Sequence, residues 1–369
     1  MATPTLALSQ RLDLVPAMLT VGLSAIFNII RAPFRGSGGA KTFGRQVQNG
    51  ITRSLAGRLS IAQLQYVRGT STATFEKWAS KQSSVEVSTE NIGKGAKLHW
   101  IGDKKSTKVM LHIHGGGYIL PLSIGHLEML NYFRHTVKES TGVDIAIAIL
   151  EYTLSSHAPY PTQFEQANAA LNHLVRSGVS AANLIVSGDS AGAHIALCVV
   201  SHILHPHPAV EAAPVLSSPF AGLLLISPRV TNATSAASFS ENSTRDILTK
   251  ETFISWITNF RSNSDISTDQ GLARDGLYTE PLDASDEWWK GMATKVARNI
   301  FLSAGEHECM RDPITGLAEN WKRVEGLDIT FIVEEKGIHD SPLMDVGRAP
   351  SDLVLAVGHW LSKTVTQTV

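Results

Sequence analysis

The sequence predicts an α/β protein with a mostly parallel central sheet and helices on both of its faces. From Lys97 onward, β-type apolar runs alternate with segments of helical periodicity. One predicted strand ends in three consecutive glycines, and another leads directly into the pattern Gly-x-Ser-x-Gly. The 369 residues, of which 43% are hydrophobic and 18% charged, are enough for one large folded domain with an appended cap.

Residues 1–90 are predicted to form an N-terminal helical cap segment. Its apolar run, residues 14–30, would make an amphipathic helix about 25 Å long. The run is shorter than the ~20 residues that a helix needs to span a bilayer. We expect this helix to cover the substrate site; the alternative is an anchor at a membrane surface or across the membrane. Up to Ser60 the only acid is Asp13, against seven lysines and arginines, so anionic lipid would attract the segment. No small-residue cleavage site follows the run, which disfavours a secretory signal.

The core is predicted in two parts, residues 91–228 and 293–369, separated by a cap insertion at residues 229–292. Seven segments have the apolar pattern of buried strands: Lys97–Ile101, Lys108–His112, Asp144–Leu150, Asn183–Ser187, Gly222–Ile226, Asn299–Ser303 and Asp328–Val333. Five segments have helical periodicity: Gly125–Lys138, Thr162–Arg176, Ala191–Leu204, Ile314–Val324 and Ser351–Lys363. The insertion is longer than an ordinary connection and includes a helical piece at Glu251–Phe260.

Composition excludes several classes of partner. A formal net charge of -1 gives no field for holding nucleic acid. The only cysteines, Cys198 and Cys309, make neither a disulfide framework nor a thiolate metal cluster, so we expect a cytoplasmic location. His112 and His114 lie at metal-ligand spacing, but the adjoining glycine loop explains His114 more simply. No dinucleotide or zinc-binding pattern occurs, so no metal and no cofactor are expected.

The strand Asn183–Ser187 runs into Gly188-Asp189-Ser190-Ala191-Gly192, and a helix begins directly afterwards. This strand–turn–helix context is the one in which a nucleophilic serine sits on a sharp turn. The pattern alone arises by chance in roughly one chain of this size in ten, and the alternative is an ordinary glycine turn. The context makes Ser190 the candidate nucleophile.

The strand Lys108–His112 leads into His114-Gly115-Gly116-Gly117-Tyr118. Successive glycines leave backbone N–H groups free to bind a ligand oxygen, and such donors stabilise the oxyanion of a tetrahedral intermediate. A phosphate-binding loop would require a Lys and a Ser or Thr at the Walker spacing, which are absent. A purely structural glycine turn remains the other interpretation.

These two motifs resemble those of the hormone-sensitive-lipase family of α/β-hydrolases. Tyr152-Thr153-Leu154 with Tyr160-Pro161, and Leu225-Ile226-Ser227-Pro228, are similar to further segments of that family, although Ser156 and His157 replace its usual Pro-Glu. The resemblance extends from about Lys97 to the C-terminus. It implies an α/β-hydrolase fold with a mainly helical cap and a carboxylic ester hydrolase that uses a Ser–acid–His triad.

His339 follows a late strand in a glycine-containing loop, the position of the family's base. The segment Gly305-Glu306-His307-Glu308-Cys309-Met310-Arg311-Asp312 is similar to the family's G-x-x-D-x-L-x-D, and Glu308 stands where its first Asp does. We therefore expect Glu308 to be the acid, with Asp312 and then Glu306 as alternatives. The resemblance also implies an oxyanion hole made by the N–H groups of Gly116, Gly117 and Ala191.

Four residues are candidates for the wall of a substrate pocket: Tyr118, Asp189, Trp288 and Trp289. The paired tryptophans would equally serve to pack cap against core. Asn242, Asp246 and Leu248, with Glu280-Pro281, are similar to the cap side of fungal family members, many of which tailor small metabolites. No cationic clamp for a charged substrate is apparent from the sequence.

The expected function is hydrolysis of a short-acyl or acetyl ester of a small hydrophobic molecule through an acyl-enzyme on Ser190. A non-hydrolytic tailoring step, cyclisation or acyl transfer, would use the same triad, because exclusion of water by the cap decides between the two. A small-molecule receptor is the third possibility, but the plant gibberellin receptors that resemble this family lack the catalytic histidine. The oligomeric state stays open.

Overall fold

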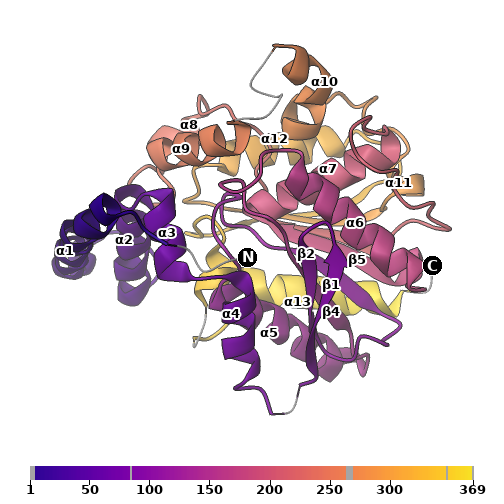
Figure 1. Cartoon of the computed structure of the whole chain (residues 1–369), viewed down its shortest axis with the longest axis horizontal. Helices are drawn as coiled ribbons and strands as arrows, with labels where there is room; N and C mark the ends of the chain where they lie inside the picture. The colour runs from indigo at the N-terminus through magenta and orange to yellow at the C-terminus, as the bar shows by residue number, and fades with distance from the viewer. Residues whose placement is uncertain (1–4, 84, 263–268, 346–347, 368–369) are drawn as a thin grey trace.

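The computed structural model describes residues 5–83, 85–262, 269–345 and 348–367. Its centre is an eight-stranded sheet with the order β1-β2-β4-β3-β5-β6-β7-β8 (Figure 1). β2 pairs antiparallel with both β1 and β4, and the remaining neighbours are parallel. The strands are β1 Val87–Gly93, β2 Ala96–Ile101, β3 Val109–Ile113, β4 Ala146–Glu151, β5 Leu184–Asp189, β6 Gly222–Ile226, β7 Asn299–Gly305 and β8 Asp328–Glu334.

The predicted mostly parallel sheet is confirmed, and each of the seven predicted strands is present within two residues at either end. The edge strand β1 was not predicted. Its residues Ser88 to Asn91 are polar and alternately half buried and exposed, because the strand has a neighbour on one side only. The sheet therefore begins inside residues 1–90, the segment predicted to be a helical cap.

Each face of the sheet buries its own hydrophobic cluster. In β3, Val109, Leu111 and Ile113 belong to one cluster and Met110 to the other, as the alternation of side chains along a strand requires. Because parallel strands in the middle of a sheet are covered on both faces, β3 is buried at all five positions. Helices α5 and α13 cover one face and α6, α7 and α12 the other (Figure 1). Their bounds are α5 Ile124–Thr141, α6 Thr162–Arg176, α7 Ser190–Leu204, α12 Arg311–Trp321 and α13 Asp352–Thr366.

The segment predicted as a cap insertion, residues 229–292, holds α8 Ala237–Glu241, α9 Lys250–Arg261, α10 Asp269–Thr279, the 3-10 turn η4 Pro281–Asp283 and α11 Met292–Lys295. The remaining 3-10 turns are η1 Ala32–Phe34, η2 Ala181–Asn183 and η5 Ser341–Met344. In Figure 1, α8, α9 and α10 lie above the face that α7 covers. α10 and α11 both contact α7.

Four helices precede the sheet: α1 Leu8–Arg31, α2 Phe43–Arg58, α3 Ile61–Arg68 and α4 Ser71–Ala79. α1 and α2 pack against each other at the side of the molecule, α2 contacts α9 of the insertion, and α4 lies against α5 (Figure 1). A third hydrophobic cluster joins these parts, with Ala17 and Val21 of α1, Leu64 of α3 and Trp256 of α9 among its members.

Helix α1 is longer than the predicted residues 14–30. It begins at Leu8 and continues through Pro16. The stretch Leu8–Phe34 is the one part of the described chain that is long and apolar enough to cross a membrane, a property that by itself is weak support for a membrane location.

Candidate active site

The structure places Ser190 at the turn between β5 and α7. Its backbone has a φ of 49°, which is strained for a residue with a side chain. Gly188 makes this turn possible, because a Cβ there would lie 2.6 Å from the backbone nitrogen of Ala193. Ser190 is therefore held on a tight elbow at the carboxyl end of β5, which is where ligands bind in sheets of this kind.

Ser190, His339 and Glu308 form one hydrogen-bonded chain. Ser190 Oγ lies 2.8 Å from His339 Nε2, and His339 Nδ1 lies 2.7 Å from Glu308 Oε1. All three residues are buried, Glu308 completely. Glu308 follows β7 and His339 follows β8, so residues from three separate connections meet at one edge of the sheet.

The two alternative acids lie elsewhere. Asp312 accepts a hydrogen bond from the backbone N–H of Ser238 at 2.9 Å and pairs with Arg311, so it stabilises the start of α8. Glu306 accepts the backbone N–H of Lys336 at 2.7 Å. Of the three candidate acids, only Glu308 has a hydrogen bond with the imidazole.

Two residues that the sequence analysis gave no part in the site hold this chain of groups in place. Ser227, at the end of β6, donates its hydroxyl to Glu308 Oε2 at 2.9 Å and accepts the backbone N–H of Asp340 at 3.2 Å. The buried carboxylate of Asp246 accepts the backbone N–H of His339 at 3.0 Å and that of Cys309 at 2.7 Å. The Leu-x-Ser-Pro segment and the cap-side pattern included these residues, but their sequence positions do not show which loops they bind.

Asp340 is a third unanticipated neighbour. Its Oδ2 lies 3.3 Å from His339 Nε2, on the side where Ser190 lies, and its other oxygen has no partner among the described residues. Burial lowers the pKa of His339, but the carboxylates of Asp340 and Glu308 more than offset this and raise it to about 10. Burial also raises the pKa of Asp340 well above its usual range. The imidazole thus has one acid at each ring nitrogen.

The glycine loop after β3 faces the same point. Gly116 and Gly117 have φ of 98° and 59°, and both line a cavity together with Ser190. A side chain at Gly117 would collide with the indole of Trp256. Ala191 is the second residue of α7, where backbone N–H groups have no partner within the helix. The glycine loop and the first turn of α7 thus meet at Ser190.

Beneath this loop, Asp189 accepts the backbone N–H of Gly115 at 3.0 Å and contacts the imidazoles of His126 and His112 at 3.1 and 3.2 Å. Burial raises the pKa of Asp189, but the two imidazoles more than offset this and hold it below its usual range. Asp189 is thus a buried anchor of the glycine loop.

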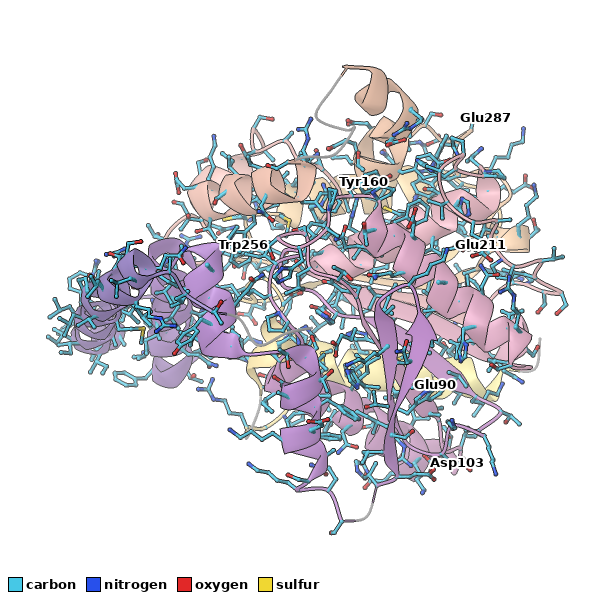
Figure 2. The ribbon with its side chains drawn as sticks, viewed as in Figure 1. Glu90, Asp103, Tyr160, Glu211, Trp256 and Glu287 are labelled. Carbon is cyan, nitrogen blue, oxygen red and sulfur yellow. The ribbon has the colours of Figure 1, made fainter. Side chains whose placement is uncertain are left out.

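A cavity of about 380 Å³ opens at Ser190. Its walls come from α2 and α3, the glycine loop, the start of α5, the insertion and the loop after β8 (Figure 1). Trp256, labelled in Figure 2 where α9 approaches the N-terminal helices, belongs to this wall. Most of the wall is apolar: Leu55, Ala56, Leu64, Leu120, Pro121, Ile124, Ile247, Leu248, Trp256, Leu343 and Met344. Arg68 at the end of α3 adds a cation that the sequence analysis did not anticipate.

None of the four residues predicted to line the pocket belongs to this cavity. Tyr118 is fully buried. Its hydroxyl forms a hydrogen bond with His194 Nδ1 at 2.8 Å, and its ring stacks on that of Phe260. Asp189 lies under the glycine loop. Trp288 stacks on His205, and Trp289 packs against Trp321 with no exposed surface. The tryptophans thus take the packing role that was the alternative.

The described residues contain no group of three or more His, Cys, Asp or Glu side chains placed to hold a metal ion. Cys198 and Cys309 are free and buried, and burial raises the pKa of the Cys198 thiol to about 12. Neither thiol is therefore a nucleophile at neutral pH.

Comparison with known proteins agrees with this geometry. A family model described as alpha/beta hydrolase fold matches residues 110–343. A lipase of Moraxella is 33% identical over 110 residues, covering 28% of this chain and 24% of the lipase. A putative steryl acetyl hydrolase of Schizosaccharomyces pombe is 23% identical over 265 residues, 68% of this chain and 65% of that protein. The matched regions thus span less than two thirds of the length of either relative.

Among solved structures, an esterase from the bacterial hormone-sensitive lipase family superimposes with a TM-score of 0.62 at 18% sequence identity. The alignment covers 93% of this chain and 98% of that one. At this identity the likeness shows the fold alone.

Proposed function

Because the chain belongs to the α/β-hydrolase family, in its hormone-sensitive-lipase-like branch with fungal esterase relatives, we propose that it is a serine carboxylesterase. The observation that carries this proposal is the unbroken chain of hydrogen bonds from Ser190 through His339 to Glu308. A serine activated by an oriented imidazole, beside free N–H donors, is the arrangement that acyl transfer requires.

In the proposed mechanism, Ser190 Oγ attacks the ester carbonyl while His339 Nε2 takes the hydroxyl proton. The N–H groups of Gly116, Gly117 and Ala191 stabilise the oxyanion that develops. The bond to the alcohol oxygen then breaks, and His339 returns its proton to that oxygen. Water, activated by the same imidazole, releases the acid and restores Ser190. Glu308 stays ionised and stabilises the imidazolium throughout.

The substrate we propose is an acetyl or other short-acyl ester of a small hydrophobic alcohol. The mostly apolar wall of the 380 Å³ cavity supports a hydrophobic ligand. The relative from Schizosaccharomyces pombe is described as a putative steryl acetyl hydrolase, and an acetyl-hydrolase of Streptomyces hygroscopicus is 30% identical over 122 residues. Both names support an acetyl group as the acyl part.

The insertion at residues 229–292 and the helices before the sheet are proposed to act together as the cap over the site. The lining of the active-site cavity supports a shared cap, because it combines Trp256 and Leu248 of the insertion with Leu55 and Leu64 of the N-terminal helices.

We further propose that α1 lies on a membrane surface in a cytoplasmic enzyme. Its outward apolar residues, such as Leu19 and Leu23 at 65% and 68% exposure, support this.

The test is hydrolysis of p-nitrophenyl acetate, butyrate and octanoate by the full-length protein, with Ser190→Ala and a folded control beside it. We expect turnover of the short esters and a loss in kcat on the order of 10⁴ or more in Ser190→Ala. Hydrolysis that survives in Ser190→Ala at the wild-type rate would contradict the proposal. A folded wild type that is inert toward all three esters would direct the search to non-hydrolytic acyl transfer or cyclisation.

A further inference from the structure

A second cavity, of about 550 Å³, lies on the far side of α2 from the active-site cavity. Helix α2 separates the two: Thr52 and Leu55 face the active site, whereas Asn49 and Arg53 face the second cavity. The second cavity lies between α1, the loop after it, and the residues that follow α8. It is thus a separate cavity beside the same N-terminal helices.

Four arginines belong to its lining, together with the neutral imidazole of His307 and no Asp or Glu: Arg31, Arg35, Arg53 and Arg245. Two of these cations have no counter-charge. Among the described residues, neither Arg31 nor Arg245 makes a side-chain hydrogen bond or ion pair; Arg31 lies over the Phe27 ring at 5.2 Å, and Arg245 lies against Gly38.

The other two arginines hydrogen-bond to backbone oxygens, and Asp246 also gives Arg53 a nearby negative charge. Arg35 donates to the backbone oxygens of Ala32 and Ala40, and Arg53 donates to that of Asp246 at 2.5 Å. The ring of His307 is 95% buried without a hydrogen bond to a described residue. Burial lowers the pKa of this imidazole, and Arg245 lowers it further.

Asn49 adds a neutral polar group to the same wall. It is 4% exposed, and its side-chain oxygen has no partner among the described residues. Two carboxylates adjacent in sequence to lining residues have backbone partners, Glu306 with Lys336 and Asp246 with Cys309, and Asp246 also attracts Arg53. The unpartnered atom of Asn49 is an acceptor, so the case for an anion rests on the four arginines and on the absence of Asp and Glu from the lining.

An apolar surface borders this cavity. Phe27 and Phe34 belong to its lining and are 55% and 84% exposed. From them a continuous apolar stripe follows the outward side of α1, opposite the buried Ala17 and Val21, with exposures between 56% and 68%: Leu12, Val15, Leu19, Leu23, Ile26 and Ile30. Surfaces of this extent are unusual in water and mark contact with a partner or a membrane.

We propose that this cavity binds the phosphate of an anionic phospholipid headgroup while the α1 stripe lies among the adjoining acyl chains. The inference rests on the proposed membrane contact of α1 and adds a defined headgroup site to it. Arg31 and Arg245 supply the guanidinium donors, which match phosphate oxygens in geometry, and His307 and Asn49 line the interior.

The test is flotation of the full-length protein with vesicles of phosphatidylcholine alone and of phosphatidylcholine mixed with phosphatidylglycerol. The cavity variant is Arg31→Gln/Arg245→Gln. The charge-matched control is Arg11→Gln/Lys41→Gln, which removes two exposed cations of the same N-terminal part outside the cavity. A third variant, Leu19→Glu/Leu23→Glu, disrupts the apolar stripe. Thermal melts confirm that each variant is folded.

We expect the wild type to prefer the phosphatidylglycerol vesicles and the cavity variant to bind them about 30-fold more weakly, since each direct guanidinium–phosphate contact that is lost should weaken binding roughly fivefold. The control variant should lose much less. Equal losses in the cavity variant and in the charge-matched control would show diffuse attraction and overturn the headgroup site.

The remaining outcomes separate this proposal from the one it rests on. If the Leu19→Glu/Leu23→Glu variant loses binding while the cavity variant binds like wild type, the membrane contact stands and the headgroup site fails. If wild type binds neither vesicle, both fail, and the esterase proposal is untouched because it is assayed on soluble esters. If calorimetry detects binding of glycerol 3-phosphate, and the protein does not prefer the phosphatidylglycerol vesicles, the cavity binds a soluble phosphate ester. That result would overturn the proposed lipid headgroup.

Discussion

His339 has an acid at each of its ring nitrogens, and the two acids have opposite consequences. Glu308, 2.7 Å from Nδ1, orients the ring so that Nε2 faces Ser190. Asp340, 3.3 Å from Nε2, favours a proton on the nitrogen that must accept one from Ser190. The charge of Asp340 therefore stabilises the protonated imidazole and opposes its action as a base.

This leads to a pH prediction. Since the pKa of His339 is raised to about 10 and only the neutral imidazole accepts a proton, kcat/KM of the wild type should rise with pH toward that value. Asp340→Asn removes the acid beside Nε2 and should shift the rising limb about one pH unit or more toward lower pH. Asn suits the backbone at this position, where φ is 50°.

The control for this profile is Asp352→Asn, which removes an exposed carboxylate paired with Lys41. Its profile should coincide with that of the wild type. A profile of Asp340→Asn with an unshifted limb would show that Asp340 does not set the proton affinity of the base.

The choice of acid is a second prediction at this scale. Glu308→Gln removes the charge that stabilises the imidazolium, so kcat for p-nitrophenyl acetate should fall by about 10⁴. Asp312→Asn should change kcat by no more than a few-fold and cost about 1 kcal/mol of stability, because Asp312 caps α8. The reverse order of the two kcat values would reassign the acid.

Among elements, the loops after β7 and β8 carry the acid and the base, and a residue outside both loops connects them. Asp246, which belongs to the insertion, accepts one backbone N–H from each. Burial raises the pKa of this carboxyl to about 6, although the backbone donors favour its charged form. The insertion therefore contributes to the geometry of the site as well as to the cavity wall.

Asp246→Asn tests this link, because an amide would turn an NH₂ group toward a backbone N–H. We expect a loss of about 2–3 kcal/mol in the free energy of unfolding, measured in urea, together with a reduced kcat. Glu241→Gln, which breaks an exposed pair with Arg311, should stay within about 0.5 kcal/mol of wild type. An equally small effect for Asp246→Asn would mean that the loops are held by other contacts.

The elements that could be predicted are those whose pattern is local. The buried strands are short apolar runs, and the turns at Ser190 and Gly116 carry glycines that close packing demands. β1 was missed because an edge strand with Ser88 to Asn91 has no such run. The pocket residues were predicted wrongly because the sequence does not show whether an aromatic side chain such as Tyr118 or Trp289 faces a ligand or the core. Only the tertiary packing, which buries both side chains completely, decides this.

At the scale of the whole molecule, the active-site cavity is shared between distant parts of the chain. The strand ends supply Ser190 and His339, the insertion supplies Trp256, and α2 supplies Leu55 and Ala56. The family resemblance covered the core but not the first 90 residues, so the sequence could not show that α2 and α3 form a wall of the cavity.

Ala56→Phe tests this joint construction by filling the cavity from α2. We expect kcat/KM for p-nitrophenyl octanoate to fall on the order of tenfold more than kcat/KM for the acetate, because lost space penalises the larger ligand. Gly57→Ala, at the next position but outside the cavity lining, is the control. Equal effects on the two esters would indicate that α2 does not shape the substrate site.

The central claim, that Ser190 forms the acyl-enzyme, is tested most directly by covalent labelling. The full-length protein is treated with a fluorophosphonate, its ester hydrolysis is followed, and the modified residue is located by peptide mass spectrometry. We predict one adduct on Ser190, formed in step with the loss of activity and absent in His339→Ala, because only an activated serine reacts. Full ester hydrolysis by a protein left unlabelled, or inactivation with the adduct on another residue, would contradict the claim.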